Sequence, residues 1–252
     1  MPKQKDDYGT GAFSRFKSES YAPYLRLDVD VPWQDIYREA LPFKDQCPSK
    51  DYVFHGESTS QGWSAGCLHG HAFEQVQSRG SYPKALRGLD TGYRWIKAVE
   101  DQCPVTVNYF KHIFTPHTQY RRLRWMWLEP GGFVKPHVDD DERILAINLA
   151  IYNPKGCEFV FGKDQVLPFE NGTAFVIDAG QQHHVVNDSN EARLHIQVHG
   201  KDITEWYDNI IEHSLNQYKG TRWIGKDEKY EYERDWMNPK KLFKQMVEDY
   251  NR

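Results

Sequence analysis

The chain has 252 residues, and its 32 Lys and Arg against 36 Asp and Glu give a formal net charge of −4. This charge argues against a nucleic-acid-binding protein, because such proteins carry a concentrated basic surface. A mean hydropathy of −0.79, with no apolar stretch of about 18 residues, predicts no membrane span. The four cysteines form no CxxC pair, which predicts reduced, buried thiols and a cytoplasmic location: Cys47, Cys67, Cys103 and Cys157.

The N-terminal half predicts a loose arm followed by short, mixed elements. Residues 1–20 are polar and contain Gly and Ser, so we expect a flexible arm ahead of one domain over 21–252. The arm has no apolar core, so no signal peptide is expected. Periodicity and turn residues then predict strands over 24–29, 51–55 and 63–68, and helices over 33–40, 91–101 and 105–114.

From residue 121 the hydrophobic pattern changes to a period of two, which is typical of strands. The predicted strands cover 123–127, 133–139, 144–152, 157–161, 173–177, 185–186 and 192–198, with Gly-containing turns at 130–132 and 171–172. So many short strands predict a jelly-roll core over about 121–200 in a fold that is mainly β with flanking helices. Helices over 203–218 and 239–250 make 201–252 a helical C-terminal extension.

A His-x-Asp motif lies on the second of these strands. Residues i and i+2 of a strand face the same way, so His137 and Asp139 present an imidazole and a carboxylate side by side. One further His from a later strand, His183 or His184, would complete the two-His, one-carboxylate triad that holds Fe(II) and leaves positions open. The acids that follow, at 140–142, are more simply a solvated loop.

The strand over 192–198 separates polar from apolar residues completely. One face carries Arg193, His195, Gln197 and His199, and the other carries Leu194, Ile196 and Val198. In a jelly roll the polar face lines the cavity, where an Arg can bind a carboxylate through two parallel hydrogen bonds. On the strand over 144–152, Ala146, Asn148 and Ala150 leave room for a ligand, although close contact with a neighbouring strand would also select Ala.

Taken together, these motifs resemble those of a known family. The matching segments lie within 122–200: Leu128-Glu129-Pro130-Gly131-Gly132, Pro136-His137-Val138-Asp139, the run Asn148 to Pro154, the run His183 to Ser189, and Arg193-Leu194-His195. They resemble the double-stranded β-helix of Fe(II)/2-oxoglutarate-dependent dioxygenases. Within these, the chain is most similar to the aspartyl/asparaginyl β-hydroxylase family, including its bacterial branch that resembles proline hydroxylases.

The resemblance implies roles for particular residues of a single catalytic domain. His137, Asp139 and His183 would be the iron ligands, and Arg193 would bind 2-oxoglutarate with Asn148 near it. The family places this Arg ten positions after the distal His, which favours His183 over His184. The implied cofactors are Fe(II), 2-oxoglutarate and O2. The implied reaction hydroxylates an unactivated C–H bond of an amino acid, free or within a peptide or protein, and yields succinate and CO2.

Several alternatives stay open at this point. Arg124 and Trp127, on the strand that leads into the site, are candidate substrate contacts, although Arg124 could equally be a cation at a strand edge. The chain has Asp139, which the animal members lack, and Ala146 where they carry a basic residue; both departures argue against a strict peptidyl-aspartate activity. A cupin-type binding protein, or a non-redox metal-dependent hydrolase or isomerase, would use the same scaffold. The C-terminal helices could cover the site or form a dimer contact.

Overall fold

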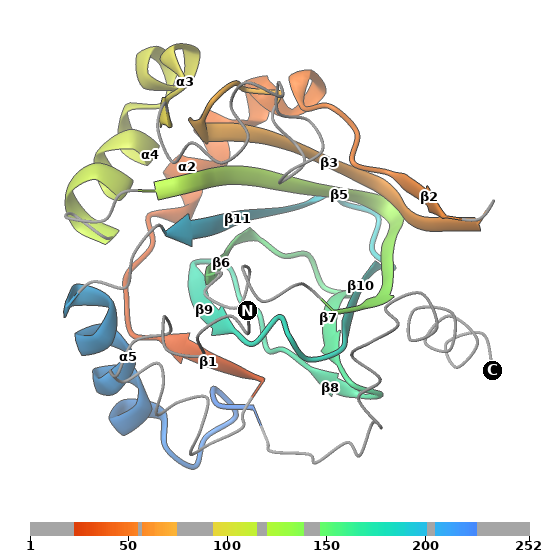
Figure 1. Cartoon of the computed structure of the whole chain (residues 1–252), viewed down its shortest axis with the longest axis vertical. Coiled ribbons are helices and arrows are strands. Elements are labelled where there is room, and N and C mark those ends of the chain that lie inside the picture. The colour runs from red at the N-terminus through yellow and green to blue at the C-terminus, as the bar shows by residue number, and fades with distance from the viewer. Residues whose placement is uncertain are drawn as a thin grey trace, which may run out of the picture.

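The computed structural model describes residues 23–54, 57–74, 93–114, 120–138, 147–200 and 205–225, and these residues form a curled antiparallel sheet flanked by helices (Figure 1). The strands are β1 (Tyr24–Leu27), β2 (Tyr52–Phe54), β3 (Glu57–Gly70), β4 (Arg94–Trp95), β5 (Tyr120–His137), β6 (Ile147–Tyr152), β7 (Cys157–Phe161), β8 (Gln165–Val166), β9 (Thr173–Ile177), β10 (His183–Asn187) and β11 (Arg193–Gly200). The helical segments are α2 (Trp33–Ala40), a 3₁₀ helix (Leu41–Gln46), α3 (Lys97–Gln102), α4 (Pro104–Asn108), a π-helical turn (Tyr109–Phe114) and α5 (Glu205–Tyr218).

The long strand β5 belongs to both halves of the sheet. Its first limb pairs with β11 and β3, and after a bend at 130–132 its second limb pairs with β10 (Figure 1). One half therefore runs β1-β9-β6-β11-β5, and the other runs β5-β10-β7-β8. Apart from the paired strands β7 and β8, successive strands from β5 to β11 alternate between the two halves, which is the topology of a jelly roll or double-stranded β-helix. The predicted fold class is confirmed.

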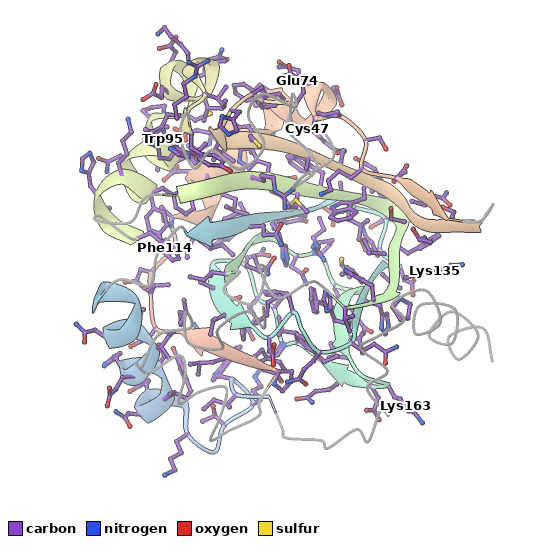
Figure 2. All side chains as sticks on the ribbon, viewed as in Figure 1. Cys47, Glu74, Trp95, Phe114, Lys135 and Lys163 are labelled. Atoms are coloured by element: carbon purple, nitrogen blue, oxygen red, sulfur yellow. The ribbon has the colours of Figure 1, made fainter. Side chains whose placement is uncertain are left out.

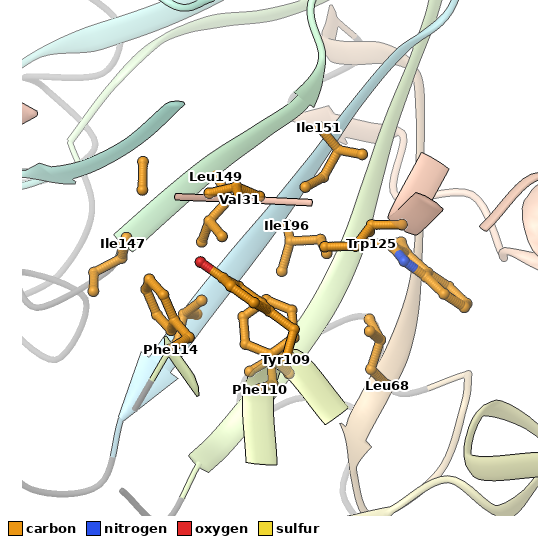
Figure 3. Packing of buried hydrophobic residues seen from close by; sticks show 14 of the residues in the cluster. Val31, Leu68, Tyr109, Phe110, Phe114, Trp125, Ile147, Leu149, Ile151 and Ile196 are labelled. Carbon is orange, nitrogen blue, oxygen red and sulfur yellow. The ribbon is translucent and has the colours of Figure 1, made fainter. Parts of the chain in front are cut away.

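Alternation along the strands divides the buried residues into two clusters. Trp125, Leu149 and Ile196 face the helices, and Tyr109 and Phe114 pack against this face (Figure 3). The opposite faces enclose the space between the two halves with a second apolar cluster, which includes Leu128, Phe159, Phe161, Phe175 and Val185. Figure 2 shows side chains filling that space, with Phe114 and Trp95 on the helix side. The predicted period of two thus separates the side chains that pack against the helices from those that line the space between the two halves of the sheet.

Some elements differ from the sequence-based prediction because tertiary pairing overrides local pattern. The predicted helix over 91–101 is β4 followed by α3, since Arg94 and Trp95 pair with the end of β3. The predicted helix over 105–114 changes to π-helical geometry at Tyr109. The N-terminal arm (1–20) and the predicted helix over 239–250 lie outside the described residues. In the part that the structure describes, no helix is long and apolar enough to cross a membrane.

The chain after α5 returns to the free edge of β1. Backbone amides of Arg26 and Gly225 donate to the carbonyls of Trp223 and Tyr24, each at 2.9 Å, and Leu25 forms a bridge with Ile224. Asp28, just after β1, accepts hydrogen bonds from the side chains of Tyr218 at 3.1 Å and His213 at 2.8 Å. The end of α5 and residues 221–225 are therefore fixed to β1.

The bend in β5 depends on Gly132, and its neighbour Gly131 offers a matched control. A Cβ on Gly132 would lie 2.7 Å from the Glu129 carbonyl oxygen and 3.0 Å from that of Gln61, both backbone atoms that cannot move aside cheaply. A Cβ on Gly131 would meet nothing, although φ is +69° there. We expect Gly131→Ala to cost about 1 kcal/mol of unfolding free energy and Gly132→Ala up to about 3 kcal/mol. Urea denaturation measures both, and equal losses would contradict the collision.

Candidate active site

His137 and His183 lie together at one end of the interior. They are partners across the β5–β10 ladder, and their ring centroids are 4.3 Å apart. The imidazole of His183 is buried and stacks on Phe159, with the two rings 5.1 Å apart and only 7° from parallel. The Phe159 ring of β7 therefore holds His183, one of the predicted histidine ligands, in place.

The hydrogen bonds of the two imidazoles select one tautomer. Nδ1 of His137 lies 2.9 Å from the carbonyl oxygen of Lys135, and Nδ1 of His183 lies 2.9 Å from that of Gln181. A carbonyl can only accept a hydrogen bond, so each Nδ1 carries the proton and donates. In the neutral ring the lone pair is then on Nε2, which is the atom that can bind a metal.

His184 occupies the other face of β10. His183, Val185 and Asn187 are buried, whereas His184 alternates with them and is only partly buried. Burial lowers the pKa of the His184 imidazole, and the proximity of His137 lowers it further. By this alternation His183, and not His184, shares the interior with His137.

Asp139 lies outside the described residues, which stop at Val138 before the gap at 139–146. No third His, Cys, Asp or Glu joins His137 and His183 to form a metal-binding group within the ranges that the structure describes. The carboxylate of the predicted triad therefore remains a prediction, and so do the solvated acids at 140–142 and the small residue Ala146.

Arg193 carries a buried guanidinium with unsatisfied donors. The residue is 6% exposed, and its Nε and Nη1 have no hydrogen-bond partner in the part of the chain that is described. Burial lowers the pKa of the guanidinium, while contact with the Cys157 thiol opposes that effect. Since burying an unpaired charge is costly, this position is suited to an anion that enters the interior and accepts from these donors.

Two further polar side chains on the interior face that carries Arg193 also have unsatisfied atoms. His195 is fully buried; its Nε2 lies 3.2 Å from Oδ1 of Asn153, and its Nδ1 has no partner among the described residues. Burial lowers the pKa of His195 far below its ordinary value, so the ring is neutral. The buried Nδ2 of Asn148 likewise has no partner there. Unsatisfied polar atoms gathered on one interior face indicate a place for a polar ligand.

The sequence pattern puts His195 on the polar face without indicating a role for it, and Cys157 is not among the predicted site residues. The polar, period-two pattern of 193–199 was the signal for His195. Nothing in the sequence marked Cys157, because only the folding of β7 over β11 brings its thiol to Arg193.

The register of the sheet sets how far each of these residues lies from the bend of β5, and this distance is called its depth, the deepest residues being those nearest the bend. Across neighbouring strands, Arg124, Gln197, Asn148, Phe175 and Arg26 form one row. His137 lies about as many residues after the bend of β5 as Arg124 lies before it, whereas Arg193 pairs with Leu128 beside the bend. The row therefore lies about as far from the bend as the two histidines do, and Arg193 lies deeper, next to the bend.

The two predicted substrate contacts are separated by the structure. Arg124 is 4% exposed, faces the interior and donates to Oε1 of Gln197. Trp127 is fully buried on the opposite face, with its ring 6.2 Å from that of Tyr37 and 5.6 Å from Nζ of Lys44. The assignment of Trp127 to the substrate site is therefore wrong, because residues at an odd separation on a strand face opposite ways.

Asn187 fastens the end of β10 to the bend of β5. Its buried Nδ2 donates to the carbonyl oxygens of Leu128 at 2.9 Å and Glu129 at 3.1 Å, and its Oδ1 accepts from the Ser189 hydroxyl at 2.6 Å. A side chain whose polar groups are all bonded specifies one geometry. It thereby fixes the strand that carries His183 relative to the strand that carries His137.

Comparison with known proteins gives one family and a set of distant structures. Residues 31–201 match the family described as aspartyl/asparaginyl beta-hydroxylase. A 2OG-Fe(II) oxygenase-family oxidoreductase from Burkholderia pseudomallei is 11% identical, with 77% of this chain and 93% of the other covered and a TM-score of 0.43. A Pseudomonas putida prolyl-4-hydroxylase is 14% identical, with 76% and 97% covered and a TM-score of 0.42. A search of curated proteins found no match.

Proposed function

Because this chain belongs to the aspartyl/asparaginyl β-hydroxylase family, we propose that it hydroxylates an unactivated C–H bond of an amino acid, free or within a peptide. Family membership makes the protein an oxygenase that uses Fe(II), 2-oxoglutarate and O2. A binding protein without catalysis, which the sequence had left open, is thereby set aside. The observation that carries the assignment of the site is the buried guanidinium of Arg193, whose Nε and Nη1 have no partner among the described residues, in the same interior as His137 and His183.

The residues present fit an iron centre. Nδ1 of His137 and Nδ1 of His183 each donate to a backbone carbonyl, so in the neutral rings Nε2 is the atom that would bind the metal. Asp139 follows His137 at the spacing that a strand needs to bring its carboxylate to the same face. We assign these three residues as ligands. When bound, Fe(II) supplies the activation of O2 coupled to oxidative decarboxylation of 2-oxoglutarate.

Arg193 is the residue proposed to bind the distal carboxylate of 2-oxoglutarate. The guanidinium is a rigid planar group of donors suited to a carboxylate, and two of its nitrogens, Nε and Nη1, lack protein partners among the described residues. A bound carboxylate would accept from an unsatisfied donor and offset the burial of the charge. Asn148, whose Nδ2 also has no partner there, would donate to the co-substrate nearer the histidines.

The remaining interior residues orient the substrate and exclude water. Leu128, Phe159 and Val185 make the inner wall apolar beside Arg193, so a carboxylate there meets little competing solvent. Arg124 and Gln197, which bond to each other at the depth of the histidines, present a fixed polar surface to the substrate. The substrate therefore enters at the end of the interior where the row of Arg124 lies.

The test of this function is anaerobic. Adding Fe(II) and then 2-oxoglutarate to the purified chain is expected to produce the visible metal-to-ligand charge-transfer absorption of a chelated keto acid. Admission of O2 with a panel of amino acids and peptides should then release succinate. Iron that binds without this absorption would reject the assignment. Turnover of a substrate under nitrogen with Zn(II) or Mn(II) would favour the non-redox hydrolase or isomerase instead.

A further inference from the structure

Arg26 of β1 presents a guanidinium that is stacked on aromatic rings and forms no ion pair with an acidic residue in the described part of the chain. Its Cζ lies 4.2 Å from the ring centroid of Trp223 and 5.4 Å from that of Tyr218. Its Nε is buried and makes no hydrogen bond to any described residue. The aromatic rings stabilise the positive charge but do not accept the in-plane hydrogen bond of Nε, so this donor is left for an anion.

The indole of Trp223 provides an internal comparison. A second guanidinium, that of Arg222, lies 4.4 Å from the same ring. Arg222 forms an ion pair with Glu170, and the pair is exposed to solvent. Two arginines therefore share one indole: Arg222 has its carboxylate from within the chain, whereas Arg26 makes no such pair among the described residues.

Arg26 lies at the depth of the proposed iron ligands. It pairs with Phe175 on β9, which pairs with Asn148 on β6, so it ends the row that begins at Arg124. The Phe175 ring lies 6.2 Å from that of Trp223. Tyr24, two residues before Arg26 on the same face, contacts Phe161, whose ring lies 5.7 Å from His183. A continuous interior surface thus joins Arg26 to the histidines.

The surroundings of Arg26 hold it in this position before any ligand binds. The backbone amide of Arg26 donates to the carbonyl of Trp223 at 2.9 Å, which fixes the ring directly beside the guanidinium. Neither Arg26 nor residues 218–223 fall within the segment 31–201 that matches the family. The arrangement is therefore built by the flanking parts of this chain, and it bears on what this particular protein recognises.

We propose that Arg26 binds the free α-carboxylate of an amino-acid substrate and so selects free amino acids over residues inside a peptide. This inference rests on the proposed function. The carboxylate would accept two hydrogen bonds from the guanidinium, while Arg193 holds 2-oxoglutarate deeper in the interior. Two separate arginines at two depths would then keep the anionic ends of substrate and co-substrate apart.

The experiment measures succinate release with the twenty L-amino acids, each paired with its own α-carboxamide. For the wild-type protein, at least one acid is expected to stimulate turnover, and its amide to be at least about tenfold weaker, as loss of a charged hydrogen bond implies. Arg26→Gln should raise the KM for that acid by about tenfold or more and bring acid and amide close to parity. Arg222→Gln, on the same indole, is the matched control and should retain the preference.

The outcomes separate this inference from the proposed function. The anaerobic absorption with 2-oxoglutarate should be present in both the wild type and Arg26→Gln, because Arg193 holds the co-substrate. Absence of the absorption in the wild type rejects the proposed function. With the absorption present, amides as effective as acids, or no stimulation by any acid of the panel, overturns the role of Arg26. An acid preference that Arg26→Gln leaves unchanged overturns it as well.

Discussion

Replacing Arg193 by Met is expected to abolish the stabilisation of the protein by 2-oxoglutarate. The substitution should not lower the free energy of unfolding of the ligand-free protein. The guanidinium is buried and has two donors with no partner among the described residues, so it stabilises a bound carboxylate more than it stabilises the ligand-free protein. Truncating one partner of a buried charge pair costs about 2–5 kcal/mol of binding free energy. We therefore expect the KM for 2-oxoglutarate to rise by about 100-fold or more.

Thermal unfolding with and without 2-oxoglutarate measures this effect apart from turnover. A ligand that binds only the folded state raises the Tm, and Arg193→Met should lose that rise while its Tm without ligand stays at or above that of the wild type. Arg193→Lys keeps the charge but not the planar pair of donors, so it should recover only part of the response. An unchanged rise in Arg193→Met would mean that another cation, such as Arg124, binds the co-substrate.

His183→Ala is expected to abolish iron binding, and His184→Ala is its matched control. The two residues are neighbours of identical chemistry on opposite faces of β10, so the control removes the same functional group one position further along the strand. Only His183 has its Nε2 in the interior beside His137. Removal of a ligand should lower the affinity for Fe(II) by more than the 10–100-fold typical of residues that merely support a ligand.

Anaerobic titration with Fe(II), followed by metal analysis of the desalted protein, gives the affinity and the stoichiometry. We expect one iron per chain in the wild type and in His184→Ala, and little in His183→Ala, whose far-UV circular dichroism should remain that of a folded sheet. The same titration on Asp139→Ala tests the third ligand. Iron retained by His183→Ala but lost from His184→Ala would reassign the distal ligand to His184.

The local sequence pattern was sufficient to predict the structure wherever a single periodicity determines which face of an element a side chain occupies. Because side chains alternate along a strand, the sequence alone separated Arg193, His195 and Gln197 from the apolar residues between them, and the structure has the two groups on opposite faces. The predicted boundaries of β7 and β9, and those of the helix α2 predicted after Pro32, are the boundaries in the structure. The alternation of side chains also placed Trp127 opposite Arg124, so the proposal that both contact the substrate contradicted the alternation on which it depended.

The sequence by itself thus determined the fold class, the polar face of β11 and the spacing that relates His183 to Arg193. Only the tertiary structure decided which distant residues share the interior: the thiol of Cys157 beside Arg193, the tautomers of His137 and His183, and the stacking of Arg26 on Trp223. Periodicity records which face a side chain occupies, and that is local information. Which strand or turn lies opposite that face depends on the bend in β5 and on pairing between segments far apart in the chain, and no local pattern encodes it.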